Sequence, residues 1–356
     1  MTDDQSLPLI FDGHNDVLLR MKMRSGDPVR RFLDGQQEGH LDLPRMLEGG
    51  FGGGLFAVFV PSREKGKAPE TKMEGVNYDI PLPPPLEQAQ ALPDVMRMVS
   101  LLLRIETQSQ GRFRICRSAA DIRAAMAERA IAAVLHFEGA EAIDPDFDAL
   151  EVFHAAGLRS LGPVWSRPTL YAEGVPFRFP STADIGNGLT DAGKALVKRC
   201  NELRIAIDLS HMNEKGFWDV AELSDAPLIA SHSNAHAVCP HARNLSDDQL
   251  AAVRDSGGIV GLNFATSFLR EDGQQGAAID LDIMLRHLDH MIEIMGETHV
   301  GLGSDFDGAQ VPQDIKDCAG LGNLRAAMRA HGYDEETMRL LCHENWLRVL
   351  ETTWGG

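Results

Sequence analysis

Residues 190–211 read TDAGKALVKRCNELRIAIDLSH, and this stretch holds one complete unit of the pattern that decides the fold. Thr190 can cap the N-terminus of a helix that we expect over Thr190–Glu202. The apolar run Ile205–Leu209 follows and is typical of a buried parallel strand. His211 comes just after that strand. The stretch therefore predicts a helix, a buried strand and a polar side chain at the carboxyl end of the strand.

The same unit recurs along the chain. Helical patterns precede other apolar runs, for example Ala119–Glu128 and Ser246–Ser256, and in the latter Ser246 with Gln249 resembles a capping box. Strand and helix alternating eight times predicts an α/β fold, a (β/α)8 TIM-like barrel, with an open doubly wound sheet as the alternative. The eight runs that we expect as strands are Leu9–Asp12, Leu55–Val60, Ile131–His136, Ser160–Trp165, Ile205–Leu209, Leu228–Ser231, Ile259–Phe264 and Val300–Gly303.

Two insertions interrupt this rhythm, one after the second strand (residues 61–118) and one after the fourth (residues 166–189). The first contains the run PLPPPL and an amphipathic helix expected around Asp94–Thr107. The second is rich in Pro, Gly and aromatic residues, and a loop of that length after a strand is usually functional. We find no internal repeat and no linker, so we expect one barrel domain over residues 1–356.

The composition of the chain restricts the classes of binding partner and the cellular compartment that we expect. The net charge of −18 argues against nucleic acid or an anionic membrane surface as a partner. No apolar stretch is long enough to span a bilayer, and residues 1–8 lack the features of a signal peptide. The five cysteines are odd in number and show no CxxC spacing, which suits a reducing compartment. We therefore expect a cytoplasmic protein.

The informative side chains stand at strand ends. In a parallel barrel these ends all open on one face, where catalytic groups collect. Six residues able to bind a metal should therefore meet on one rim, although they are spread over most of the chain. They are His14, Asp16, Glu138, His211, His232 and Asp305.

His14 and Asp16 are two residues apart, so an extended backbone points both side chains to the same side, where they can share a divalent ion. A hydrogen-bonded polar pair is the alternative. Glu138 follows an apolar strand, where a carboxylate is costly unless it is paired or bound to a cation. It could bridge two ions with its two oxygens. Alternatively, Glu138 stands at a helix N-terminus, where the helix dipole stabilises its charge. Glu141 competes with Glu138 for the bridging role.

His211 and His232 each follow a serine at the end of consecutive strands. Neutral imidazoles placed there would suit a second ion that shares Glu138, whereas a lone histidine of this kind is more often a hydrogen-bonded core residue. Asp305 and Asp307 flank Phe306 in GSDFDG. A carboxylate near the metals can act as general acid and base, and Asp305 is nearer the strand end. Turn chemistry is the alternative for both aspartates.

Two further residues are candidate substrate contacts. Arg243 lies in the loop after the sixth strand and can hold a substrate carboxylate through two parallel hydrogen bonds, although a surface salt bridge would also explain it. His136 lies two residues before Glu138, so it can face the same pocket.

These residues in this order resemble the membrane (renal) dipeptidase family of binuclear zinc peptidases. The similarity covers most of the chain and is densest in DGHND, HFEG, SHSNAHAVCPHARNLSDDQL and GLGSDFDG. The resemblance implies a zinc-dependent dipeptidase with two Zn²⁺ ions per chain and a small dipeptide as substrate. It implies one ion on His14, Asp16 and the bridging Glu138, and the other on Glu138, His211 and His232.

The resemblance also implies that a metal-bridging hydroxide attacks the peptide bond, that Asp305 handles the proton and that Arg243 binds the substrate's terminal carboxylate. One departure is clear. Better-known members have a substrate-binding histidine at the end of the fourth strand, where this chain has Trp165, so substrate choice can differ. A homo-oligomer is possible, as is common for such barrels. Hydrolysis of another small amide and a catalytically silent metal-binding scaffold are the rival functions.

Overall fold

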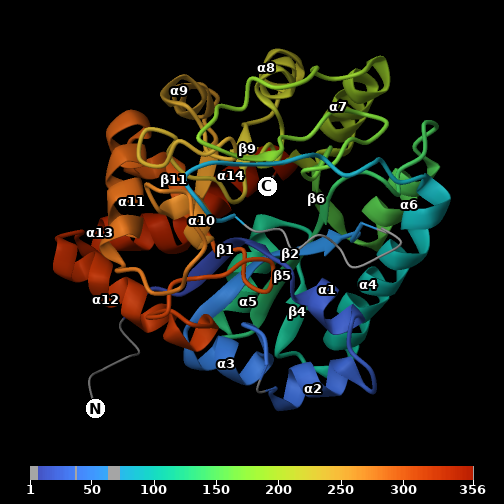
Figure 1. The fold of residues 1–356 in the computed structure, drawn as a ribbon. Helices are drawn as coiled ribbons and strands as arrows, with labels where there is room; N and C mark the ends of the chain where they lie inside the picture. The colour runs from blue at the N-terminus through green and yellow to red at the C-terminus, as the bar shows by residue number, and fades with distance from the viewer. Residues whose placement is uncertain (1–6, 37, 63–72, 356) are drawn as a thin grey trace.

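The computed structural model describes residues 7–36, 38–62 and 73–355. Most of the N-terminal segment considered above, and part of the first insertion, lie outside these ranges. Figure 1 looks along a ring of parallel strands surrounded by helices. The barrel strands are β1 (Ile10–Asn15), β2 (Phe51–Phe59), β5 (Ile131–Glu138), β6 (Leu158–Gly162), β8 (Ala206–Ile207), β9 (Ile229–Ala230), β10 (Ile259–Asn263) and β11 (Val300–Gly303).

The strands pair in the order β8-β6-β5-β2-β1-β11-β10-β9, and every pairing is parallel. The circle closes between β8 and β9 through one bridge, in which Leu209 N donates to Ile229 O at 2.8 Å. The predicted barrel is therefore confirmed. Eight strands occur in the predicted places, but β8 and β9 are only two residues long because the backbone beyond them turns to build the rim.

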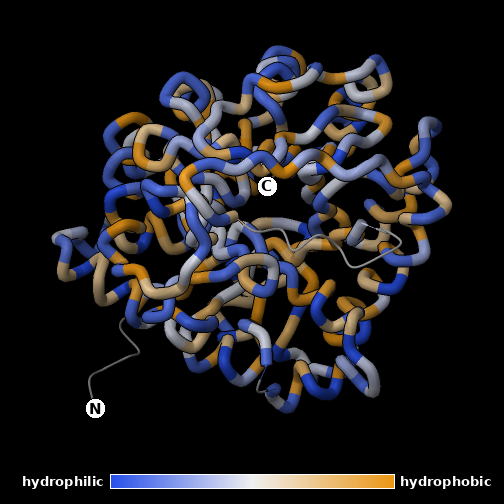
Figure 2. Tube along the Cα trace, viewed as in Figure 1, coloured by the Kyte–Doolittle hydropathy of each residue, from blue (hydrophilic) through white to orange (hydrophobic). Residues whose placement is uncertain are grey.

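Helices follow the strands and cover the outside of the barrel. Figure 2 shows their turns alternating between hydrophilic and hydrophobic colours, as expected for helices with one face on the strands. Thr190 and Ser246 cap their helices as predicted. The helices are α1 (Val17–Lys22), α2 (Pro28–Asp34), α3 (Leu43–Glu48), α4 (Gln88–Gln108), α5 (Ala119–Ala127), α6 (Asp148–Ala156), α7 (Asp191–Leu203), α8 (Glu214–Leu223), α9 (Asp247–Asp255), α10 (Thr266–Leu269), α11 (Asp282–Met295), α12 (Leu321–His331), α13 (Glu335–Arg339) and α14 (Asn345–Trp354).

Three single helical turns in the described residues also belong to this layer. Two are 3-10 turns, and the third is a π turn between α13 and α14. They are η2 (Glu297–His299), η3 (Cys318–Gly320) and η4 (Leu340–Glu344).

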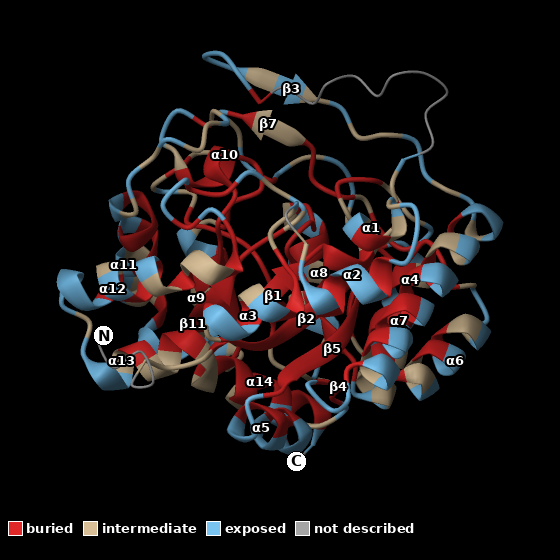
Figure 3. Ribbon diagram, turned by 90° about the horizontal axis from the view of Figure 1, so that it is seen from below, coloured by how far each residue is buried: buried red, intermediate tan, exposed pale blue. Residues whose placement is uncertain are grey.

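The two insertions meet above one end of the barrel. β3 (Tyr78–Ile80) of the first pairs antiparallel with β7 (Phe177–Phe179) of the second. Figure 3 shows this pair at one end of the molecule and α14 and α5 at the other. The first insertion also supplies α4 and the short β4 (Phe113–Ile115), which pairs with the start of β5. The sequence predicted the two insertions but not their pairing, because three-residue strands leave no periodic signal.

Trp346 of α14 fills the opposite end of the barrel. Its side chain is fully buried, and its indole Nε1 donates to Leu302 O at 3.0 Å. A Cβ at Gly13 or Gly301 would lie 2.5 Å or 2.7 Å from the indole. Residues without side chains on adjacent strands therefore create the space that this ring occupies.

Replacing Trp346 by alanine should lower the free energy of unfolding by about 3–5 kcal/mol, because the cavity cannot be refilled by neighbouring glycines. Urea unfolding followed by circular dichroism measures this. Trp218→Ala is the matched control, since Trp218 on α8 is 39% exposed, and it should lower the free energy of unfolding by clearly less than Trp346→Ala. Equal losses for the two variants would contradict this account of the barrel floor.

Candidate metal centre and active site

The structure brings the six predicted rim residues together at the carboxyl ends of the barrel strands. All are buried, with exposed fractions from 0% for His14 to 9% for Asp305. His14 and Glu138 belong to β1 and β5 themselves. Asp16 precedes α1 but forms no side-chain cap bond to it, so its carboxylate is available to the cluster.

Glu138 lies at the centre of the cluster. Its Oε1 is 3.0 Å from His211 Nε2 and 3.6 Å from His232 Nε2. Its Oε2 is 3.7 Å from His14 Nε2, which is in turn 3.4 Å from Asp16 Oδ2. The two oxygens of one carboxylate therefore face two different groups of ligand atoms.

Several buried ligand atoms in the described residues lack a hydrogen-bond partner, among them both ring nitrogens of His14 and Asp16 Oδ1. Buried polar atoms are normally hydrogen-bonded, because an unpaired one costs free energy. His211 Nε2 and His232 Nε2 also lie only 3.1 Å apart, so at most one proton fits between them. A divalent cation would satisfy these atoms, and the sets His14–Glu138–His232 and His14–Asp16–Asp305 have the spacing to hold one.

The charges in the cluster shift its pKa values in opposite directions. Burial, together with the charges of Asp16 and Asp305, raises the pKa of Glu138 well above its usual range. Burial and the positive charge of Arg243 lower the pKa of His211, and burial and His14 do the same for His232. Both imidazoles are thus neutral at pH 7, which is the form that binds a metal.

His14 behaves differently from the other two imidazoles. Burial lowers its pKa, but the charges of Glu138 and Asp16 outweigh burial and raise the pKa to about 10. Positive charge is therefore favoured at this position.

Asp305 borders the cluster and the cavity above it. Its backbone has φ +57°, a left-handed conformation that costs free energy for a residue with a side chain. Asn263 Nδ2 donates to its Oδ2 at 3.1 Å, and burial raises its pKa. Asp307, the competing aspartate, instead accepts a hydrogen bond from His40 N at 2.8 Å. Glu141, the competitor of Glu138, is held by Arg167 in a buried ion pair.

The three predicted substrate contacts occupy different places. Trp165 lines the cavity. Arg243 is buried beside the cluster, with Nη2 3.3 Å from His211 Nε2 and 3.1 Å from His232 O. His136 lies deeper, where its Nδ1 contacts Ser160 Oγ at 2.9 Å. The roles of these residues toward substrate stay predictions.

The sequence reading missed two carboxylates and an aromatic wall. Asp12 and Asp208 are buried at 1% and 3% exposure under the cluster. Both lie inside predicted apolar strands, where a carboxylate is costly unless it is bonded, and this signal could have found them. Phe177 of β7 and Phe268 of α10 line the cavity with Trp165. Phe177 lies in the aromatic-rich insertion that the sequence marked as functional, whereas nothing in the sequence distinguishes Phe268 from an ordinary core residue.

A family model described as membrane dipeptidase, peptidase family M19, matches residues 5–354. The chain belongs to this family. The predicted family and the predicted metallo-dipeptidase activity are thereby confirmed. Among the described residues no helix of this M19 protein is long and apolar enough to cross a membrane.

Solved structures resemble this M19 chain over nearly its full length. A metallopeptidase from Rhodobacter sphaeroides, liganded with a phosphinate mimic of the dipeptide L-Ala-D-Ala, is 57% identical. Its TM-score is 0.96, and the match covers 98% of this chain and 100% of that one. A metallopeptidase called dipeptidase AC is 56% identical with a TM-score of 0.95, covering 99% and 100%. Dipeptidase tcpJ from Claviceps purpurea is 27% identical over 350 residues, covering 95% of this chain and 76% of that protein.

Gly308 allows two carboxylates of the cluster to approach. A Cβ there would lie 2.2 Å from Asp16 Oδ2 and 2.4 Å from Asp305 Oδ1. Gly308→Ala should displace both and lower kcat/KM for dipeptide hydrolysis by about 100-fold, since a shift of about 1 Å has that effect. Gly322→Ala is the control, because the nearest atom to its Cβ, Arg325 Nη2, is 4.0 Å away. Wild-type activity in Gly308→Ala would show that this contact does not position the carboxylates.

Proposed function

We propose that this protein is a two-zinc dipeptidase that hydrolyses small dipeptides of the L-Ala-D-Ala kind. The observation that carries the proposal is the position of Glu138, whose two oxygens face separate groups of buried ligand atoms. The residues that would hold the ions are His14, Asp16, Glu138, His211 and His232. Imidazole nitrogens and carboxylate oxygens are ligands that zinc favours.

Bound zinc ions would supply Lewis-acid polarisation of the scissile carbonyl and a water acidified to near-neutral pKa. The chain's own residues provide the rest. Asp305 carries the proton: its Oδ2 is oriented by Asn263, while Oδ1 faces the Asp16 side of the cluster. A carboxylate in that position takes a proton from the attacking water and delivers it to the departing amine.

The substrate class follows from the cavity and from the relative. The structure from Rhodobacter sphaeroides holds a mimic of L-Ala-D-Ala and shares 57% of its residues with this chain. Here Trp165 lies 5.6 Å from Phe177 and 5.8 Å from His211, measured between ring centroids. This aromatic wall stands directly beside the metal ligands, which favours small apolar side chains on the substrate. Arg243 supplies the positive charge for the terminal carboxylate.

The cysteines support a reducing compartment, and we place the protein in the cytoplasm. All five are free and buried. Burial raises the pKa of Cys116 and of Cys200 to about 12, so these thiols are unreactive at neutral pH.

Chelation tests the metal requirement and the substrate together. Protein stripped of metal with a chelator should lose L-Ala-D-Ala hydrolysis and regain it when two equivalents of zinc are added. Liquid chromatography of the released alanine measures this. N-acetyl-L-Ala-D-Ala is the matched control, since a dipeptidase requires the free amino group. Full activity in the stripped protein, or equal turnover of the acetylated compound, would overturn the proposal.

Asp305→Asn tests the proton carrier. Because the amide cannot accept and return a proton, kcat should fall by about 10²–10⁴-fold, while zinc content by mass spectrometry stays at two per chain. Asp307→Asn is the comparison, since that aspartate is bonded to His40 N instead, and its effect on kcat should be much smaller. A kcat for Asp305→Asn within threefold of wild type would refute the assignment.

A further inference from the structure

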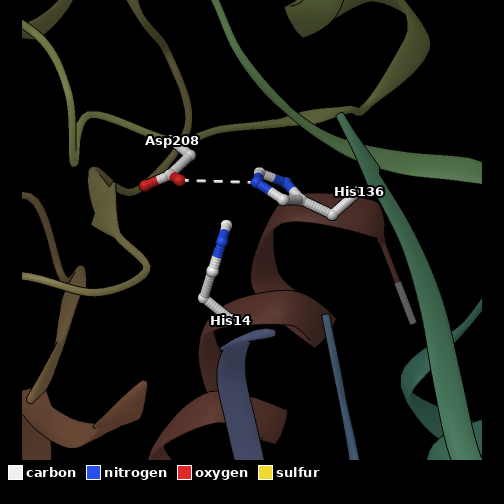
Figure 4. Close-up of side chains that lie close together, drawn as sticks. All are labelled: His14, His136 and Asp208. Carbon is white, nitrogen blue, oxygen red and sulfur yellow. Dashed lines mark ion pairs between the residues drawn. The ribbon is translucent and has the colours of Figure 1, made fainter. Parts of the chain in front are cut away.

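Asp208 is a buried carboxylate one layer below the cluster. Its Oδ1 accepts hydrogen bonds from Ser210 N at 3.1 Å, Ser210 Oγ at 2.7 Å and Ser231 N at 2.7 Å. Its Oδ2 accepts from Ser231 Oγ at 2.5 Å. Figure 4 shows Asp208 beside His136 and His14, with His136 Nε2 3.6 Å from Oδ2. Four donors converge on this one carboxylate.

Asp208, Ser231 and His232 form a hydrogen-bonded chain, and the position of each proton along it can be worked out. Ser231 Oγ has one hydrogen and contacts three acceptor-capable atoms, Asp208 Oδ2 at 2.5 Å, His232 Nδ1 at 2.8 Å and, at the longest distance of 3.2 Å, Ser210 Oγ. The hydroxyl hydrogen of Ser210 goes to Asp208 Oδ1. An ionised carboxylate can only accept, so the hydroxyl hydrogen of Ser231 goes to Asp208 Oδ2. Ser231 Oγ must then accept from His232 Nδ1–H. A neutral imidazole with its proton on Nδ1 has its lone pair on Nε2, the atom that faces Glu138 Oε1.

We propose that Asp208 is a positioning residue that acts through Ser231 to fix the tautomer of His232, so that Nε2 presents its lone pair to the metal centre. The inference rests on the proposed function, because it takes His232 as a zinc ligand. A metal-binding histidine commonly donates its other N–H to a neighbouring group that fixes its orientation. Here the neighbour is a serine, and the carboxylate behind it sets the direction of the serine's hydrogen bond.

Two similar arrangements in the site lack this connection. Asp12 Oδ2 accepts from Ser304 Oγ at 2.9 Å, but Ser304 also contacts the main-chain oxygen of His14, not a ring nitrogen. His211 Nδ1 contacts Ser166 Oγ at 2.9 Å, and within the described residues no carboxylate hydrogen-bonds to Ser166. Of these three arrangements, the one at His232 alone connects a carboxylate through a serine to an imidazole in the described residues.

Asp208→Asn reverses this chain without changing its shape. The three donors on Oδ1 require the amide oxygen of Asn to take that place, which puts the amide nitrogen opposite Ser231 Oγ. Ser231 then accepts from the amide and donates its own hydrogen to His232 Nδ1. The imidazole proton moves to Nε2, the position that the ion needs. Zinc can then bind His232 only after the hydrogen bonds of Ser231 Oγ to the introduced amide and to His232 Nδ1 have been broken or reversed.

The experiment is a competition titration of metal-free protein with zinc and a chromophoric chelator, which reports affinity without any assay of turnover. Asp208→Asn should lower the affinity for one of the two zinc ions by about 10–100-fold, which is the usual effect of losing a group that orients a metal ligand. Ser304→Ala is the matched control: it also removes a serine hydroxyl bond from a buried carboxylate, that of Asp12, but this serine contacts no ring nitrogen, so both affinities should stay within about threefold of wild type.

Ser231→Ala in the Asp208→Asn background separates a proton chain from simple structural support. Without the hydroxyl, the amide cannot impose the wrong tautomer, so the double variant should bind zinc more tightly than Asp208→Asn alone. The proposal would be overturned if the reductions in zinc affinity caused by the two substitutions multiplied in the double variant. It would also be overturned if Asp208→Asn bound zinc as tightly as the wild type. Melting temperatures of the metal-free variants should lie close together, and a zinc loss explained by a lower melting temperature would also overturn it.

His232→Ala distinguishes this inference from the proposed function. If the wild type binds two zinc ions and His232→Ala weakens one of them, the metal assignment stands whatever Asp208→Asn does. If His232→Ala binds both ions as tightly as the wild type, His232 is not a ligand and the proposed centre itself is wrong.

Discussion

The centre of this molecule depends on a carboxylate that cannot remain there unpaired. Glu138 is 4% exposed at the end of an apolar strand, with Asp16, Asp305 and Asp208 adding like charge around it. Taking such a group out of water is expensive unless positive charge compensates it. Arg243 supplies part of that charge, and Glu138 and Asp16 raise the pKa of His14 against the effect of burial. Divalent ions between the Glu138 oxygens and the imidazoles would supply it more fully, which explains why so many ligand atoms are left unbonded.

The barrel makes this concentration of charge possible because it separates folding from chemistry. Its strands contribute apolar residues to the core along most of their length, and the side chains of the cluster stand at their carboxyl ends or just beyond. Trp346 closes the other end against glycines. A rim built this way brings together residues 14 and 305 without any local sequence relationship, since each is fixed by its own strand and not by the others.

The sequence predicted the structural features that repeat along the chain. It did not predict contacts that occur once and join distant segments. Alternating apolar runs and caps such as Thr190 predicted the barrel, and polar residues just beyond the runs predicted the cluster. The strand pattern alone left Glu138 and Glu141 in competition, and the family resemblance selected Glu138. The pattern could not decide because Glu141 is paired by Arg167, which lies in the segment after the fourth barrel strand. The pairing of β3 with β7 was equally out of reach, since each strand has three residues and both depend on a partner about a hundred positions away.

The site has two parts that come from different elements of the fold and can therefore change independently. The proposed metal ligands stand at the carboxyl ends of barrel strands or just beyond them, and hydrogen bonds accepted by Asp208 and donated by Asn263 fix the residues around them. Trp165 and Phe177, in contrast, belong to the segment after the fourth barrel strand and contact each other across the cavity. Trp165, which replaces a histidine of better-known family members, therefore alters the wall of the cavity without disturbing the proposed ligand set. Members of the family can thus keep one hydrolytic centre and differ in the dipeptides that they accept.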